Sequence, residues 1–95
     1  MNSYQKAASE MATKHPNLDT LFIGLSAEVG ELCSERMREN RDDRTAKGIG
    51  EITTELGDIL WYVAVIAAEY NLDLSEVASE NLKKLNKRKE TNYVS

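Results

Sequence analysis

The apolar segment Ile59–Ala68 is the feature that most limits what this chain can fold into. If the segment is helical it is hydrophobic nearly all round, and such a helix must be buried on more than one side. The chain has 95 residues, and so small a helical unit cannot easily surround one of its own helices. We therefore expect the outer face of this segment to be a subunit interface. That face comprises Trp61, Ala64, Val65 and Ala68.

The rest of the chain also has helical periodicity, because hydrophobic residues recur at the spacing of one helix face. The pattern predicts four helices, over about 3–14, about 18–40, about 51–70 and 74 to about 89. Asn17 or Asp19 can cap the second helix, after the break at Pro16. Asp73 and Glu76 have the spacing of a capping box before the fourth. The sequence therefore predicts an all-α, four-helix unit that forms a single domain over residues 1–95.

The charged stretch 41–50, with Gly48 and Gly50, predicts a loop between the second and third helices. A helix capped by Thr45 is the alternative interpretation of its second half. We interpret the two glycines as a turn, because no phosphate-binding loop of the Walker type surrounds them. The segment after Lys89 is expected to fray.

Composition excludes several classes of protein. The net charge of -4 disfavours binding to a nucleic acid polymer, which needs a basic face. Cys33 and His15 are each the sole residue of their type, so neither an internal disulfide nor a Cys/His zinc cluster can form. The longest apolar run is far short of the roughly 20 residues that span a bilayer. With no signal-peptide pattern at the N-terminus, we expect a cytoplasmic protein without a membrane segment.

Two acidic strips lie beside the apolar stripes of the second and third predicted helices. One strip contains Glu28, Glu31 and Glu35, and the other contains Glu51, Glu55, Asp58 and Tyr62. If the two apolar faces pack together in antiparallel fashion, the carboxylates of the two strips meet. Such a cluster raises the pKa of its members unless a cation neutralises it.

Oxygen ligands of this kind favour a hard cation, Mg²⁺ or Mn²⁺. A ferritin-like di-iron site is the rival interpretation, but it needs Glu-x-x-His pairs, which this sequence does not contain. The other alternative is that the strips face water on opposite sides and pair with Arg36, Arg38 or lysines.

Three groups of residues resemble the MazG-like all-α nucleoside triphosphate pyrophosphohydrolases, from about Leu18 to Arg88. They are Glu28-Val29-Gly30-Glu31-Leu32, then Glu55-Leu56-Gly57-Asp58-Ile59-Leu60-Trp61, then Asn81 with Lys84 and Arg88. The resemblance implies Mg²⁺-dependent hydrolysis of (deoxy)nucleoside triphosphates to the monophosphate and pyrophosphate. It also implies a homodimer or a dimer of dimers.

The resemblance implies roles for individual residues as well. Glu28, Glu31, Glu55 and Asp58 are expected to bind Mg²⁺. Apart from the resemblance, a carboxylate that the metal leaves partly free can accept a proton in catalysis, and Glu31 and Glu35 are the candidates for that role. A second group is expected to contact the substrate: Tyr62, His15, Asn81, Lys84 and Arg88.

Two other functions remain to be weighed against this enzyme. One is a helical regulatory protein that keeps the fold and a structural metal without turnover, which the four retained carboxylates argue against. The other is a DNA-binding helical module, for which the basic segment 83–89 is the sole support. A basic helix end also suits the helix dipole. The preferred nucleotide, the number of metal ions, dimer versus tetramer and the biological role, housecleaning or pool control, are left open by the sequence.

Overall fold

The computed structural model describes residues 3–12, 16–42 and 45–90, and every regular element within them is an α-helix. The elements are α1 (Ser3–Met11), α2 (Leu18–Asp42), α3 (Thr45–Glu69) and α4 (Leu74–Glu90). The all-α class and the four helices predicted from the sequence are thus confirmed. Among these residues no helix combines the length and the hydropathy that crossing a membrane requires.

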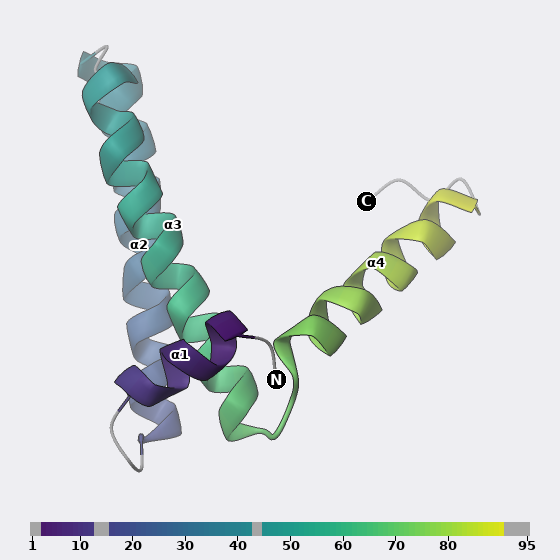
Figure 1. Cartoon of the computed structure of the whole chain (residues 1–95). Helices are drawn as coiled ribbons and strands as arrows, with labels where there is room; N and C mark the ends of the chain where they lie inside the picture. The colour runs from purple at the N-terminus through teal and green to yellow at the C-terminus, as the bar shows by residue number, and fades with distance from the viewer. Residues whose placement is uncertain (1–2, 13–15, 43–44, 91–95) are drawn as a thin grey trace.

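The two long helices α2 and α3 run antiparallel and form a hairpin (Figure 1). Asn17 caps α2, because its Oδ1 accepts a hydrogen bond of 3.1 Å from the backbone N–H of Thr20. The predicted loop over 41–50 was mostly wrong. The helix α3 already begins at Thr45, so that Gly48 and Gly50 lie within a helix and not in a turn. A Cβ at Gly48 would lie 2.9 Å from Cγ of Glu39 on α2, so a residue without a side chain leaves room for Glu39 there.

The short helix α1 packs across α3 near the base of the hairpin (Figure 1). Ala8 of α1, Leu21 of α2 and Ala64 and Val65 of α3 form the buried core. Trp61 packs against this core from the side. The predicted subunit interface over Trp61, Ala64, Val65 and Ala68 is therefore wrong for its central residues, because Ala64 and Val65 are buried within their own chain. The prediction failed because it did not take into account that α1 packs on this face of α3.

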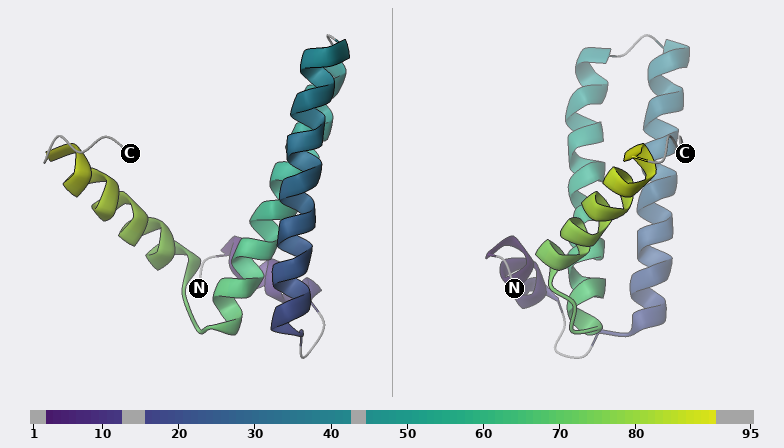
Figure 2. Two further views of the ribbon diagram at one scale, coloured as in Figure 1. Left: turned by 180° about the vertical axis from the view of Figure 1, so that it is seen from behind. Right: turned by 90° about the vertical axis from the view of Figure 1, so that its right-hand side faces the viewer.

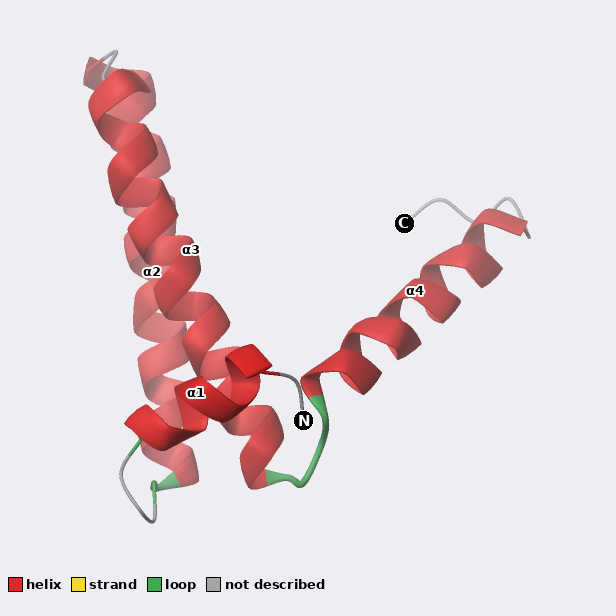
Figure 3. Ribbon diagram, in the orientation of Figure 1, coloured by secondary structure: helices red, strands yellow, loops and turns green. Residues whose placement is uncertain are grey.

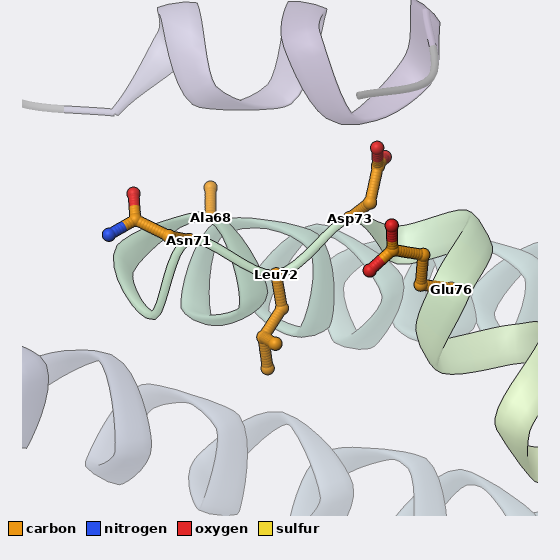
Figure 4. A pocket seen from close by; sticks show the side chains of 5 residues that line it. All are labelled: Ala68, Asn71, Leu72, Asp73 and Glu76. Atoms are coloured by element: carbon orange, nitrogen blue, oxygen red, sulfur yellow. The ribbon is translucent and has the colours of Figure 1, made fainter.

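The turn between α3 and α4 is fixed by backbone hydrogen bonds. Asn71 has a φ of 58°, and the N–H groups of Asn71 and Leu72 donate to the carbonyls of Ala68 and Ala67 at 2.9 and 2.8 Å. This is the Schellman arrangement that ends a helix at a left-handed residue. Asn tolerates that conformation better than most residues. A pocket of about 250 Å³ lies at the turn, and Figure 4 shows its lining side chains: Ala68, Asn71, Leu72, Asp73 and Glu76.

The side chain of Gln5 on α1 links the same turn to the core through hydrogen bonds. Its side chain is fully buried, and Nε2 donates to the carbonyls of Ala64 (3.2 Å) and Leu72 (2.9 Å). Its Oε1 accepts a bond of 2.9 Å from the N–H of Leu74, the first residue of α4. Helix N-termini carry N–H groups without a partner in the helix, so Gln5 caps α4 from another element.

Beyond this turn α4 diverges from the hairpin (Figure 1), as the rear view on the left of Figure 2 also shows. None of its residues is buried. The radius of gyration is 16.1 Å, whereas a compact chain of this length has about 12 Å. The accessible surface of 7196 Å² likewise exceeds the roughly 5,500 Å² expected of a compact monomer of this mass. The single chain therefore leaves an unusual amount of surface uncovered.

Candidate metal centre

Close packing of α2 on α3 determines where their acidic strips meet. A Cβ at Gly24 would lie 2.4 Å from Oη and 2.5 Å from Cζ of Tyr62, so the tyrosine ring rests directly on the α2 backbone. Real Cβ atoms do not approach other atoms so closely. Gly24 lies one helical turn before Glu28, and Tyr62 lies one turn after Asp58. The small residue thus brings the two helices together beside the acidic cluster.

Three of the four predicted metal ligands come together in the seam between α2 and α3. One carboxylate oxygen from each of Glu28, Glu55 and Asp58 lies within 4.8 Å of the other two. Glu28 and Glu55 are half-buried and Asp58 is exposed. One side of the cluster is thus shielded from solvent, and the side at Asp58 is open to it. The two strips predicted from the helical periodicity therefore do meet, and the alternative in which they face water on opposite sides does not hold for these residues.

The electrostatics of the cluster favour a bound cation. The pKa of Glu55 is raised from 4.5 to about 7. A side-chain hydrogen bond with Glu28, which requires a proton, is the largest cause. Burial and repulsion from Glu28, Asp58 and Glu31 raise it further. In addition, Oε2 of Glu55 is buried without a hydrogen-bond partner among the described residues. A hard cation would relieve both the repulsion and the missing contact.

The two further acidic candidates on α2 differ from each other. Glu31 is exposed, one turn past Glu28, and lies close enough for its charge to raise the pKa of Glu55. It does not belong to the group of three oxygens. Glu35 is buried, and its Oε1 accepts a hydrogen bond from Arg38 on the same helix. Pairing with arginine, which the sequence offered as an alternative for the whole strip, thus occurs at its far end.

A second feature beside the cluster is a pocket of about 290 Å³ at the base of the hairpin. Its lining residues are Met11, Ala12, Pro16, Asn17, Thr20, Leu21, Trp61 and Tyr62. The rings of Trp61 and Tyr62 meet edge to face, with centroids 5.1 Å apart. Tyr62 therefore lies between this pocket and the carboxylates, about 6 Å along α3 from Asp58.

The predicted substrate contacts on α4 do not lie beside the cluster within one chain. Asn81 and Lys84 are exposed on α4, and Arg88 is half-buried there. Because α4 diverges from the hairpin (Figure 1), the part of this helix that carries them stands apart from the chain's own hairpin. His15 lies outside the described residues.

Sequence reasoning missed Gly24 and the pocket residues. A signal for Gly24 was present, because a glycine one turn before Glu28 falls on the same strip and costs helix stability unless it serves packing. The pocket had no such signal, because its residues come from three separate segments: the end of α1, the start of α2 with the residues before it, and the second half of α3. The three dispersed segments form it only once the chain is folded.

Fold and site together define an all-α protein with a carboxylate centre suited to a divalent cation. The chain belongs to the family of the MazG nucleotide pyrophosphohydrolase domain, whose family model matches residues 8–93. It is also similar to the Gene 37 protein of Mycobacterium phage L5, with 33% identity over 103 residues that cover 96% of this chain and 90% of the phage protein. No solved structure matches the chain.

Proposed function

We propose that this protein hydrolyses (deoxy)nucleoside triphosphates to the monophosphate and pyrophosphate in a reaction that depends on Mg²⁺, with Mn²⁺ as a substitute. The meeting of Glu28, Glu55 and Asp58 in one seam carries the proposal, and the family of the chain agrees with it. In this view residues 1–95 act as one catalytic domain that serves nucleotide pools in the cytoplasm, by housecleaning or by pool control.

Glu28, Glu55 and Asp58 would hold the metal ion, and Glu31 would supply a fourth carboxylate from the open side of the cluster. The metal, when bound, neutralises phosphate oxygens and lowers the pKa of a bound water. Of the two candidates to accept the proton of the attacking water, Glu31 fits better. It is exposed beside the cluster, whereas Glu35 is buried and bonded to Arg38.

The pocket beside Tyr62 is our candidate for the site that binds the nucleoside part of the substrate. Aromatic faces such as those of Trp61 and Tyr62 suit stacking with a base. Asn17 and Thr20 add an amide and a hydroxyl at the rim. His15, which the resemblance gives as a contact of the base, lies outside the described residues, and its role stays a prediction.

We also propose that two or four copies of the chain assemble. The flank of the hairpin away from α1 leaves apolar side chains exposed, among them Val29, Leu56 and Leu60. On helical wheels they fall on one side of the α2–α3 seam. The surface in excess of a compact monomer, roughly 1,700 Å² per chain, fits an obligate interface.

A panel of (d)NTPs with Mg²⁺ tests the function. We expect pyrophosphate and a monophosphate, not inorganic phosphate and a diphosphate, and loss of turnover when the metal is chelated. Turnover that survives chelation would contradict the metal centre. If no nucleotide is cleaved while Mg²⁺ still stabilises the fold, the chain is instead a helical regulatory protein that retains a structural metal.

A further inference from the structure

The pocket beside Tyr62 has a polar rim at the start of α2. The loop that leads into α2 lies at the base of the hairpin (Figure 3), and Pro16 and Asn17 are its last residues. From this segment Asn17 brings an amide and Thr20 a hydroxyl to the pocket, and both residues are exposed. None of the described residues that line the pocket is charged. Neutral hydrogen-bonding groups therefore decide which ligand fits there.

The helix cap determines which way the Asn17 amide is turned. Its Oδ1 accepts the bond of 3.1 Å from the backbone N–H of Thr20. An amide nitrogen cannot accept such a bond, so the chemistry of the cap fixes the positions of the amide oxygen and nitrogen. Turning the amide round would give up the cap. The group that Asn17 can offer to a ligand is therefore Nδ2, a donor with two hydrogens.

A donor held in one orientation distinguishes bases by their exocyclic groups. Uracil, thymine, guanine and hypoxanthine present a carbonyl oxygen where cytosine and adenine present an amino group. The carbonyl accepts a bond from Nδ2 of Asn17, whereas an amino group would place two donors face to face and leave both unsatisfied. The hydroxyl of Thr20 can donate or accept, so it fits the neighbouring ring nitrogen of either kind of base. The choice thus falls to Asn17.

The walls of the pocket suit a base without selecting one. Trp61 and Tyr62 present aromatic rings that meet edge to face, and Leu21 beside them is buried. Aromatic side chains stack on every base, because every base has a π-face. The volume of about 290 Å³ lies at the small end of the range for ligand sites. The walls therefore provide affinity, and the rim provides discrimination.

We propose that Asn17 is a specificity-determining residue that selects nucleotides with a carbonyl on the base edge (uracil, thymine, guanine and hypoxanthine) over those with an amino group there (cytosine and adenine). The inference rests on the proposed function, because that function places the base in this pocket. Since Asn17 and Thr20 are exposed, water can take the place of a lost partner. We therefore expect a preference of at least about tenfold in kcat/KM, equivalent to about 1.4 kcal/mol, and not the far larger ratios of buried sites.

Hydrolysis of matched nucleotide pairs tests the selection. Wild-type protein should prefer dUTP to dCTP and dITP to dATP, since the members of each pair differ in the carbonyl or amino group alone. Asn17→Asp keeps the cap, because Asp caps helices as well as Asn does, but it replaces the donor by an acceptor and should reverse both preferences. The added charge acts on both members of a pair and cancels in their ratio. Asp19→Asn changes the charge at an exposed neighbouring position outside the pocket, and it should leave the ratios unchanged.

A binding measurement separates this inference from the proposed hydrolysis. Trp61 is the sole tryptophan of the chain, so a single indole N–H resonance in ¹⁵N NMR spectra reports on the pocket. Titration with dUMP should shift this resonance at a concentration at least about tenfold lower than titration with dCMP does, and Asn17→Asp should reverse the order. If neither nucleotide shifts the resonance, or if Asn17→Asp leaves the ratio unchanged, the proposal is overturned. Selective binding of dUMP by a protein that cleaves no triphosphate would refute the hydrolysis and support the selection.

Discussion

Substituting Gly24 by alanine tests the contact that positions the seam. The new Cβ would lie 2.4–2.6 Å from three atoms of the Tyr62 ring, so the ring or the helix must move by about 1 Å to reach ordinary contact. Overpacking of this kind costs about 1–3 kcal/mol. In a helix, alanine gains up to about 1 kcal/mol over glycine. The contact should cancel or outweigh that gain.

Gly57→Ala is the matched control, because nothing lies within 4 Å of a Cβ at that position of α3. Gly57→Ala should therefore gain the full stabilisation, up to about 1 kcal/mol, that alanine has over glycine in a helix. The two variants should thus differ by about 1–3 kcal/mol, and each kcal/mol shifts the Tm of a chain of this size by about 4–8 °C. Thermal unfolding followed by circular dichroism at one protein concentration measures the difference. Adding Tyr62→Ala should make Gly24→Ala stabilising. Equal Tm gains in the two single variants would refute the close contact.

Three further predictions concern the site, the turn and the substrate. The pKa of Glu55 in the fold, about 7, lies above its ordinary 4.5. The metal-free protein should therefore lose stability as the pH rises through about 7 while Mg²⁺ binding strengthens, which melting curves at several pH values with and without Mg²⁺ will show. Gln5→Ala should lower the unfolding free energy by about 1.5–4.5 kcal/mol in urea titrations, through three lost hydrogen bonds. Lys84→Ala should reduce kcat/KM at least about tenfold, or about 1.4 kcal/mol, and Lys83→Ala should leave it near wild type.

The helices and the acidic cluster could be predicted because both follow from local periodicity. Glu28, Glu55 and Asp58 lie directly beside the apolar stripes of their helices. When the two stripes pack together, the three carboxylates meet in one seam. The extent of α3 was harder to predict, because Gly48 and Gly50 favour a turn on intrinsic propensity alone. Packing of α3 along α2 overrides that propensity, and Gly48 lies against the side chain of Glu39 on α2.

The placement of α1 and α4 could not be predicted from periodicity. The side chain of Gln5 links α1 to α3 and to the start of α4, and its bonds go to backbone groups more than 50 positions away. Neither a hydrophobic pattern nor a sequence motif predicts hydrogen bonds from one side chain to distant backbone groups. For the same reason the sequence led us to interpret the face of α3 around Ala64 as a subunit interface.

Pyrophosphate release by Glu55→Gln is the most direct test of the metal centre and of the proposed activity. The amide keeps the shape of the side chain but removes the charge and weakens metal binding. Glu69→Gln, on an exposed position of the same helix, is the control for the substitution itself. With Mg²⁺ and the best (d)NTP of the panel, Glu55→Gln should lose nearly all turnover while its helical circular dichroism is kept, and Glu69→Gln should match the wild type. Near-normal turnover by Glu55→Gln would contradict the assignment of the cluster as the catalytic metal centre.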